Sequence, residues 1–216
     1  MLFRSYRRAI ELNPNYAHAH HWYSHYLVAT GRVEESLTES LRAIDLDPLD
    51  LPITTHLGWH YLYTHDYDRA IEQLRKALDM DSSFVPAHLF LGQAYEQKTM
   101  YAAAVAEFQQ AVALSGGSLA AAAALGHAYA VSSKRDEALR TLGQLSEISR
   151  QRYVSAYSFA VLYTGLGDKD QAFQWLEKSY QDHTPDVIYL KTDPNYDSLR
   201  SDPRFKNILS RIGLPQ

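Results

Sequence analysis

The chain contains 216 residues, 46% of them hydrophobic, and 21 Lys and Arg residues against 25 Asp and Glu residues give a formal net charge of −4. It has no cysteine, which excludes a disulfide scaffold, a thiolate metal site and a cysteine nucleophile. The absence of a basic tract argues against nucleic acid as a partner. No stretch is apolar and long enough to predict a membrane span, so a cytoplasmic protein without a membrane partner is expected.

The first predicted element is a helix within residues 1–14. Apolar residues recur there at helical spacing, namely Leu2, Tyr6, Ala9, Ile10 and Leu12. No helix precedes this one to cover its apolar face. Either the chain is cut from a longer protein, which we favour, or this edge contacts another molecule.

From residue 15 onward, small and large residues recur with a period of 34. One small position holds Ser24, Gly58, Gly92, Gly126 and Ala160, and another holds Ser36, Ala70, Ala104, Ala138 and Ala172. A short turn separates the two positions in each unit, so each unit is predicted to be a pair of helices that cross closely at the small residues. The units are 15–48, 49–82, 83–116, 117–150 and 151–184.

A 34-residue helix–turn–helix unit with these positions resembles the tetratricopeptide repeat (TPR) family. The best copies are Leu57-Gly58-Trp59-His60-Tyr61, with Ala70 and Ala77, and Leu91-Gly92-Gln93-Ala94-Tyr95, with Ala104, Phe108 and Ala111. The tryptophan that usually stands four residues before the small position is absent from all five units. The resemblance implies an all-α, right-handed superhelical solenoid in which residues 1–14 are a half repeat, and it implies a protein-binding scaffold that is not an enzyme.

Residues 185–216 no longer follow the period, because Pro185, Pro194 and Pro203 prevent a full first helix. We expect this segment to be a short helical C-terminal cap, since a solenoid needs one to cover its last apolar face. In the predicted contact, Phe205, Ile208 and Leu209 cover the last repeat around Phe173 and Leu176. The tail also resembles the ends of TPR arrays in bacterial multidomain regulators, through Tyr189-Leu190-Lys191, Asp193-Pro194 and residues 199–205. That resemblance implies a regulatory module from a larger protein.

The predicted first helices carry almost no charge: residues 17–30, 51–65, 119–133 and 153–167 contain no Asp, Glu, Lys or Arg. In TPR arrays the first helices line the concave surface, so the resemblance implies a neutral, aromatic groove for a protein or peptide. The predicted groove residues are His21, His25, Thr55, Trp59, Leu89, Gln93, His127 and Tyr157. The aromatic members are expected to be exposed, and an acidic ligand would find no fixed cation to pair with.

Histidines suggest a second possibility, because His21 with His25 and His56 with His60 have the i, i+4 spacing of helical metal sites. Neither pair has the glutamate of a zinc hydrolase, and no Ser-His-Asp arrangement can be assembled. We therefore predict packing and groove roles for these histidines, with no metal, no cofactor and no catalytic residue. Two alternatives stay open: a homodimer formed through the N-terminal half repeat, and a histidine-based metal-binding protein.

Overall fold

The computed structural model describes residues 2–213, with side chains from residue 5 onward, and this part of the chain contains helices and no strands. The α-helices are α1 (Leu2–Leu12), α2 (Ala17–Ala29), α3 (Val33–Leu46), α4 (Leu51–Tyr63), α5 (Tyr67–Met80), α6 (Val85–Gln97), α7 (Tyr101–Leu114), α8 (Leu119–Val131), α9 (Arg135–Ser149), α10 (Ala156–Gly165), α11 (Lys169–Gln181) and α12 (Pro203–Ile212). Two 3-10 helices, η1 (Pro185–Tyr189) and η2 (Pro194–Leu199), precede α12. The predicted all-α solenoid is confirmed. The side chain of Leu2 lies outside the described residues.

Glycines set the close approach of α4 to α5 and of α6 to α7. A Cβ atom added to Gly58 would stand 2.5 Å from Cγ of Leu74, and one added to Gly92 would stand 2.7 Å from the ring of Phe108. Leu74 and Phe108 have no exposed surface. Each large side chain of the second helix therefore fills the space that a missing side chain leaves on the first.

The turn inside each hairpin repeats as strictly as the helices do. Gly31, His65, Thr99, Ser133 and Gly167, which are 34 residues apart, all adopt a positive φ, between 59° and 77°. At the first of these turns, Arg32 N–H donates to the carbonyl of Leu27 and Gly31 N–H donates to that of Val28. This pair of bonds is the Schellman motif, and it satisfies carbonyl groups that a helix end otherwise leaves unpaired. The backbone keeps this conformation even where the residue is not glycine.

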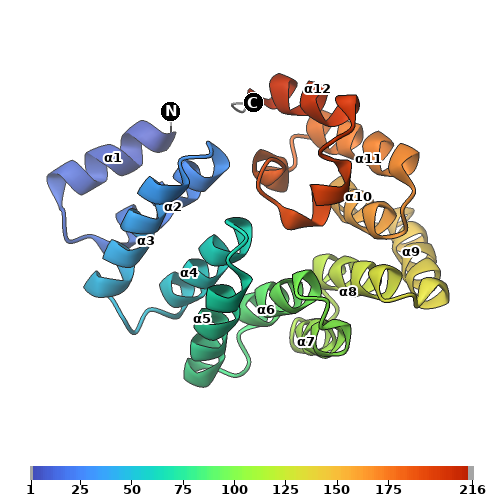
Figure 1. Cartoon of the computed structure of the whole chain (residues 1–216), viewed down its shortest axis with the longest axis horizontal. Coiled ribbons are helices and arrows are strands. Elements are labelled where there is room, and N and C mark those ends of the chain that lie inside the picture. The colour runs from blue at the N-terminus through green and yellow to red at the C-terminus, as the bar shows by residue number, and fades with distance from the viewer. Residues whose placement is uncertain (1, 214–216) are drawn as a thin grey trace.

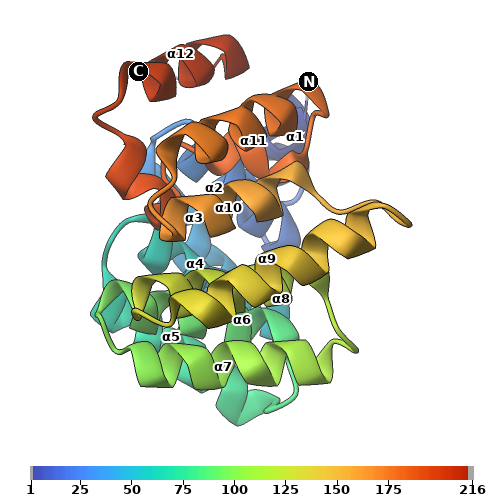
Figure 2. The ribbon, with the colours of Figure 1, turned by 90° about the vertical axis from the view of Figure 1, so that its right-hand side faces the viewer.

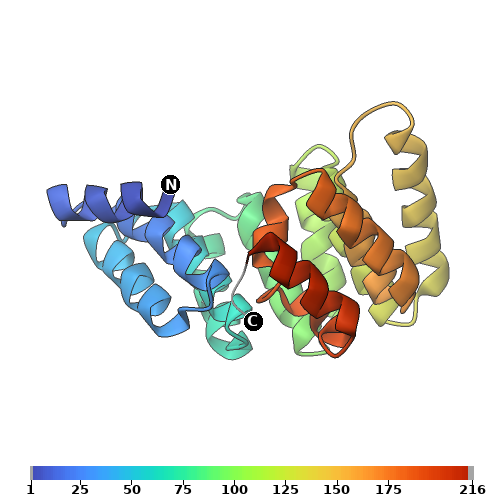
Figure 3. The same ribbon diagram turned by 90° about the horizontal axis from the view of Figure 1, so that it is seen from above.

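The hairpins follow one another around a curve, with α2, α4, α6, α8 and α10 toward its inside (Figure 1). Side views show the hairpins stacked as successive layers, and the N-terminal and C-terminal hairpins face each other across the curve (Figures 2 and 3). After α11 the chain turns back into the inside of the curve, where η1 contacts α2 and η2 contacts α10. The segment before α12 thus lies against both the first and the last hairpin.

The C-terminal helix covers the last hairpin as the sequence indicated. Phe205, Ile208 and Leu209 are buried in one apolar cluster with Phe173 and Leu176 of α11. The cluster also contains residues that the sequence analysis did not select, namely Leu190, Tyr196 and Leu199. Among the described residues, no helix is long and apolar enough to cross a membrane.

One substitution, Gly to Ala, is expected to have opposite effects at two helical positions. In α6, Gly92→Ala places a Cβ atom against the ring of Phe108, and such overpacking costs about 1–3 kcal/mol of stability. In α9, Gly143 is exposed and has no atom within 4 Å of the added Cβ, so Gly143→Ala is expected to stabilise the chain by about 0.5–1 kcal/mol. Urea unfolding of both variants measures this. Equal effects would show that α6 and α7 are not in close contact.

Candidate functional site

All eight predicted groove residues are buried or partly buried. His21, Thr55, Trp59 and His127 are buried. The other four residues, His25, Leu89, Gln93 and Tyr157, are partly buried. The expected exposure of the aromatic side chains is therefore wrong for Trp59, which is only 4% exposed. The reason is that neighbouring first helices pack together and that residues 185–202, here called the tail segment, lie along the same surface.

The N-terminal part of the tail segment inserts Tyr189 among aromatic side chains of α2 and α4. Its ring lies 5.1 Å from that of Trp59 and 6.0 Å from that of Tyr63, edge to face in both cases. Its hydroxyl oxygen lies 3.2 Å from Nδ1 of His25. Burial raises the pKa of Tyr189 to about 12, so the phenol is neutral at physiological pH. Tyr189 therefore occupies the aromatic part of the predicted groove.

The second anchor is Asp193, a carboxyl group that is only 2% exposed. The hydroxyl of Tyr157 donates to its Oδ2 at 2.5 Å, and the backbone N–H of Asn195 donates to its Oδ1 at 2.9 Å. Burial raises the pKa of Asp193 above its usual value. An acidic side chain thus does lie on the concave surface, held by a phenol and a backbone amide. Neither of these two partners is a fixed cation.

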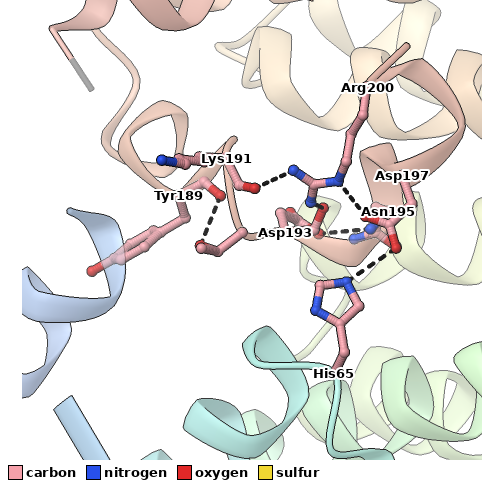
Figure 4. Close-up of polar contacts among 8 residues, drawn as sticks. His65, Tyr189, Lys191, Asp193, Asn195, Asp197 and Arg200 are labelled. Carbon is pink, nitrogen blue, oxygen red and sulfur yellow. Dashed lines mark hydrogen bonds and ion pairs between the residues drawn. The ribbon is translucent and has the colours of Figure 1, made fainter. Parts of the chain in front are cut away.

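Polar contacts at the end of the tail segment fix its path (Figure 4). The guanidinium group of Arg200 donates to the backbone carbonyls of Lys191 and Asp193 and to the carboxylate of Asp197. The other carboxylate oxygen of Asp197 lies 3.1 Å from Nε2 of His65, in the turn between α4 and α5. The tail segment is therefore tied to hairpins far from it in sequence.

A buried ion pair lies deeper on the same surface. Nδ1 of His127 on α8 contacts the carboxylate of Glu96 on α6, and both side chains are about 5% exposed. Burial by itself lowers the pKa of His127, but the charge and hydrogen bond of Glu96 outweigh it and raise this pKa. Both residues line a cavity of about 330 Å³, to which η2 contributes Pro194 and Asn195. The charges of His127 and Glu96 are thus paired within the chain.

Three of the predicted histidines gather where α2 and α4 cross. A ring nitrogen from each of His21, His25 and His56 lies within 4.8 Å of the other two. Burial lowers the pKa of His21 to about 4 and that of His25 to about 3. His60 lies apart from this cluster, with its Nδ1 3.0 Å from the hydroxyl of Ser36.

Sequence reasoning missed the tail segment as part of this surface. Tyr189 and Asp193 belong to the stretch that breaks the repeat, so no period assigned them a position. The proline spacing predicted only that no full helix forms there. The available signal was composition. Tyr189, Leu190 and Tyr196 are large and mainly apolar side chains, which are more often buried than placed in a surface loop.

Comparisons with known proteins agree with this architecture. The tetratricopeptide repeat family profile matches residues 56–118, and no curated protein matches significantly. Among solved structures, the chain is similar to YrrB, which is described as a TPR protein with an unusual peptide-binding site. The two chains have 23% identity and a TM-score of 0.51, and the match covers 86% of this chain and 96% of YrrB. PilF of Pseudomonas aeruginosa has 17% identity and a TM-score of 0.58, covering 86% of this chain and 85% of PilF.

A third similar structure is the Cut9–Hcn1 hetero-tetramer of APC/C, with 16% identity and a TM-score of 0.67. It covers 95% of this chain and 41% of the matched chain. At these identities the likeness concerns the fold. The family match covers residues 56–118, so this part of the chain consists of tetratricopeptide repeats, and the same 34-residue period of small residues extends over residues 15–184.

Proposed function

We propose that this chain is a non-catalytic scaffold that binds a protein segment along its concave surface, in the place that the tail segment occupies here. The observation that carries the proposal is the way the tail segment lies there. It is a short non-α-helical segment that anchors through Tyr189 and Asp193, four residues apart, on side chains of α2, α4 and α10. Peptides that dock in a groove use the same combination of one aromatic anchor and a few directed polar contacts.

The anchors define the chemistry of the partner. The Tyr189 position is lined by the rings of His25, Trp59 and Tyr63, so it suits an aromatic side chain with a hydroxyl group. The Asp193 position offers the hydroxyl of Tyr157, so it suits a carboxyl group. We therefore expect a partner segment with an aromatic residue followed by an acidic one. Scaffolding also agrees with the related structures, since YrrB has a peptide-binding site and Cut9–Hcn1 is a complex.

The tail segment then acts as a competitor for the partner. If a ligand binds only those chains whose tail segment is displaced, its apparent dissociation constant is the intrinsic one divided by the fraction of such chains. A tethered segment has a high effective concentration, of millimolar order for a short flexible linker. This competition gives the chain the regulatory role that the resemblance of its tail implies, because any change that releases the tail segment raises the affinity for the partner.

A labelled peptide of residues 185–202 tests this function against the full chain. In an open variant, Tyr189→Ala combined with Asp193→Ala removes both anchors from the tethered tail. We expect this variant to bind the wild-type peptide at least about ten-fold more tightly than the unsubstituted chain does, because the tethered competitor is weakened. Fluorescence anisotropy measures both affinities, and circular dichroism checks that the variant is folded.

Matched controls use the exposed neighbours of the anchors. Asp186→Asn combined with Ile188→Ala, two positions exposed to solvent, is expected to leave peptide affinity at the level of the unsubstituted chain. A peptide carrying the two anchor substitutions is expected to bind the open variant at least about ten-fold more weakly than the wild-type peptide. Equal binding of the two peptides, or no binding by the open variant, would contradict the proposal.

A further inference from the structure

We propose that His21, His25 and His56 form a binding site for one divalent transition-metal ion of the zinc type, on the concave side where α2 and α4 cross. The ring nitrogens that would hold the ion lie within 4.8 Å of one another. His21 and His25 stand one helical turn apart on α2, and His56 reaches them from α4. Three imidazoles with a fourth position for water are an established ligand set for Zn²⁺.

The hydrogen bonds around His56 already select the tautomer that a metal ligand needs. The hydroxyl of Ser24 donates its single proton to the carbonyl of His21 at 2.6 Å. Its oxygen lies 2.7 Å from Nε2 of His56 and must therefore accept a hydrogen bond from Nε2–H. Nδ1 of His56 is left with a bare lone pair. In metal sites the same arrangement, in which the second ring nitrogen donates to a neighbouring oxygen, fixes the ligating histidine.

Two of the ring nitrogens have nothing to bind within the described part of the chain. Nδ1 of His56 and Nδ1 of His21 are both buried and have no hydrogen-bond partner. Buried polar atoms normally have a partner, so an orphan of this kind needs an explanation. A metal ion in the cluster would accept such lone pairs and so give both ring nitrogens a partner.

The electrostatic surroundings favour neutral imidazole, the form that binds metals. Burial lowers the pKa of all three rings, and the pKa of His56 lies well below its usual value. The groups that face the cluster are His18 and Asp50 near His21, His60 near His56, and the hydroxyl of Tyr189 at His25. Asp50, at the start of α4, adds a negative charge close to the site, and this favours a cation.

Access and space are also present. A pocket of about 160 Å³ is lined by the three histidines together with Pro52, Thr55, Trp59, Phe84, Pro86 and Phe90. In a tetrahedral site with bonds of about 2.0–2.1 Å, the ligand atoms stand about 3.4 Å apart. The two ring nitrogens that lie farthest apart therefore have to approach each other by somewhat more than 1 Å. His25 is the one ring of the three that is only partly buried. The pocket has space for the ion and a bound water.

The test uses the full chain without an affinity tag, after removal of metal with a chelator. Titration with ZnCl₂ by calorimetry is expected to show one site per chain with a dissociation constant in the micromolar range or below. Ni²⁺ is expected to quench tryptophan fluorescence, because the ring of Trp59 lies 4.6 Å from that of His25 and 4.9 Å from that of His56. Co²⁺ is expected to give the strong visible absorption of a tetrahedral site.

Variants locate the site. His25→Ala and His56→Ala are each expected to weaken Zn²⁺ binding at least about 100-fold, and Ser24→Ala about 10–100-fold through loss of the fixed tautomer. His183→Ala changes an exposed histidine and is expected to bind as the wild type does. Unchanged affinity in a folded His25→Ala chain would overturn the proposal. If a variant does not fold, the wild-type Co²⁺ spectrum decides, and an octahedral spectrum or no binding overturns the proposal.

Discussion

Ending the chain at Asp193 is expected to lower its free energy of unfolding by several kcal/mol. The truncation removes Tyr196, Leu199, Phe205, Ile208 and Leu209, none of which is more than 7% exposed. Burying one such side chain contributes about 1.5–3 kcal/mol, although ordering the segment offsets part of the sum. Because domains unfold with only about 5–15 kcal/mol, the loss is a large share of the total stability. Urea unfolding of the two chains measures the difference.

Single substitutions separate apolar packing from the general effect of shortening the chain. Phe205 is 2% exposed within the cluster formed with α11, so Phe205→Ala is expected to cost about 3–5 kcal/mol. Lys206, its exposed neighbour on α12, provides the matched control, and Lys206→Ala is expected to change stability by less than about 0.5 kcal/mol. A stable Phe205→Ala chain would show that α12 is not a cap.

The hairpins could be predicted from the sequence because their packing is local and repeated. Gly58 and Gly92 are small for one reason, the contact with Leu74 and Phe108 sixteen residues later, and a small residue stands at the same position of every unit. A constraint that repeats every 34 residues produces a period that a single sequence displays. Helices α2 to α11 follow from it, and so does the end of the repeat at the first tail proline.

The path of the tail segment could not be predicted, because its contacts are neither local nor repeated. Tyr189 meets His25 across 164 positions, and Asp197 meets His65 across 132. Nothing in the sequence near Tyr189 indicates which hairpin will receive it. The histidine cluster is an intermediate case, since the i, i+4 spacing placed His21 and His25 together but did not bring His56 to them. That contact depends on the register between α2 and α4.

Acid is expected to destabilise the chain well above the pH at which carboxylates titrate, and His60 shows why. This side chain is 1% exposed, and its Nδ1–H donates to the hydroxyl of Ser36, whose own proton goes to the carbonyl of Ser24. Burial, and then the charge of Arg69, lower the pKa of His60 from 6.5 to about 4. Between these values the unfolded chain binds a proton that the folded chain does not.

The sign follows from that difference. Stability from His60 is fully present above pH 6.5 and is lost as the pH falls toward 4, at about 1.4 kcal/mol per pH unit and about 3 kcal/mol in all. His21, His25 and His56 act in the same direction, since their pKa values are also lowered. His127 acts in the opposite direction, because Glu96 raises its pKa and its contribution is lost as the pH rises.

Urea unfolding in a chelator at pH 7, 6 and 5 measures the effect. The glutamine in His60→Gln can still donate to Ser36 but does not titrate, so this variant is expected to lose about 1.4 kcal/mol less per pH unit than the wild type between pH 6 and 5. His183→Gln alters an exposed histidine and is expected to keep the wild-type slope. Identical slopes in all three chains would show that His60 titrates alike in the folded and unfolded states, and would therefore contradict its burial as a neutral ring between α3 and α4.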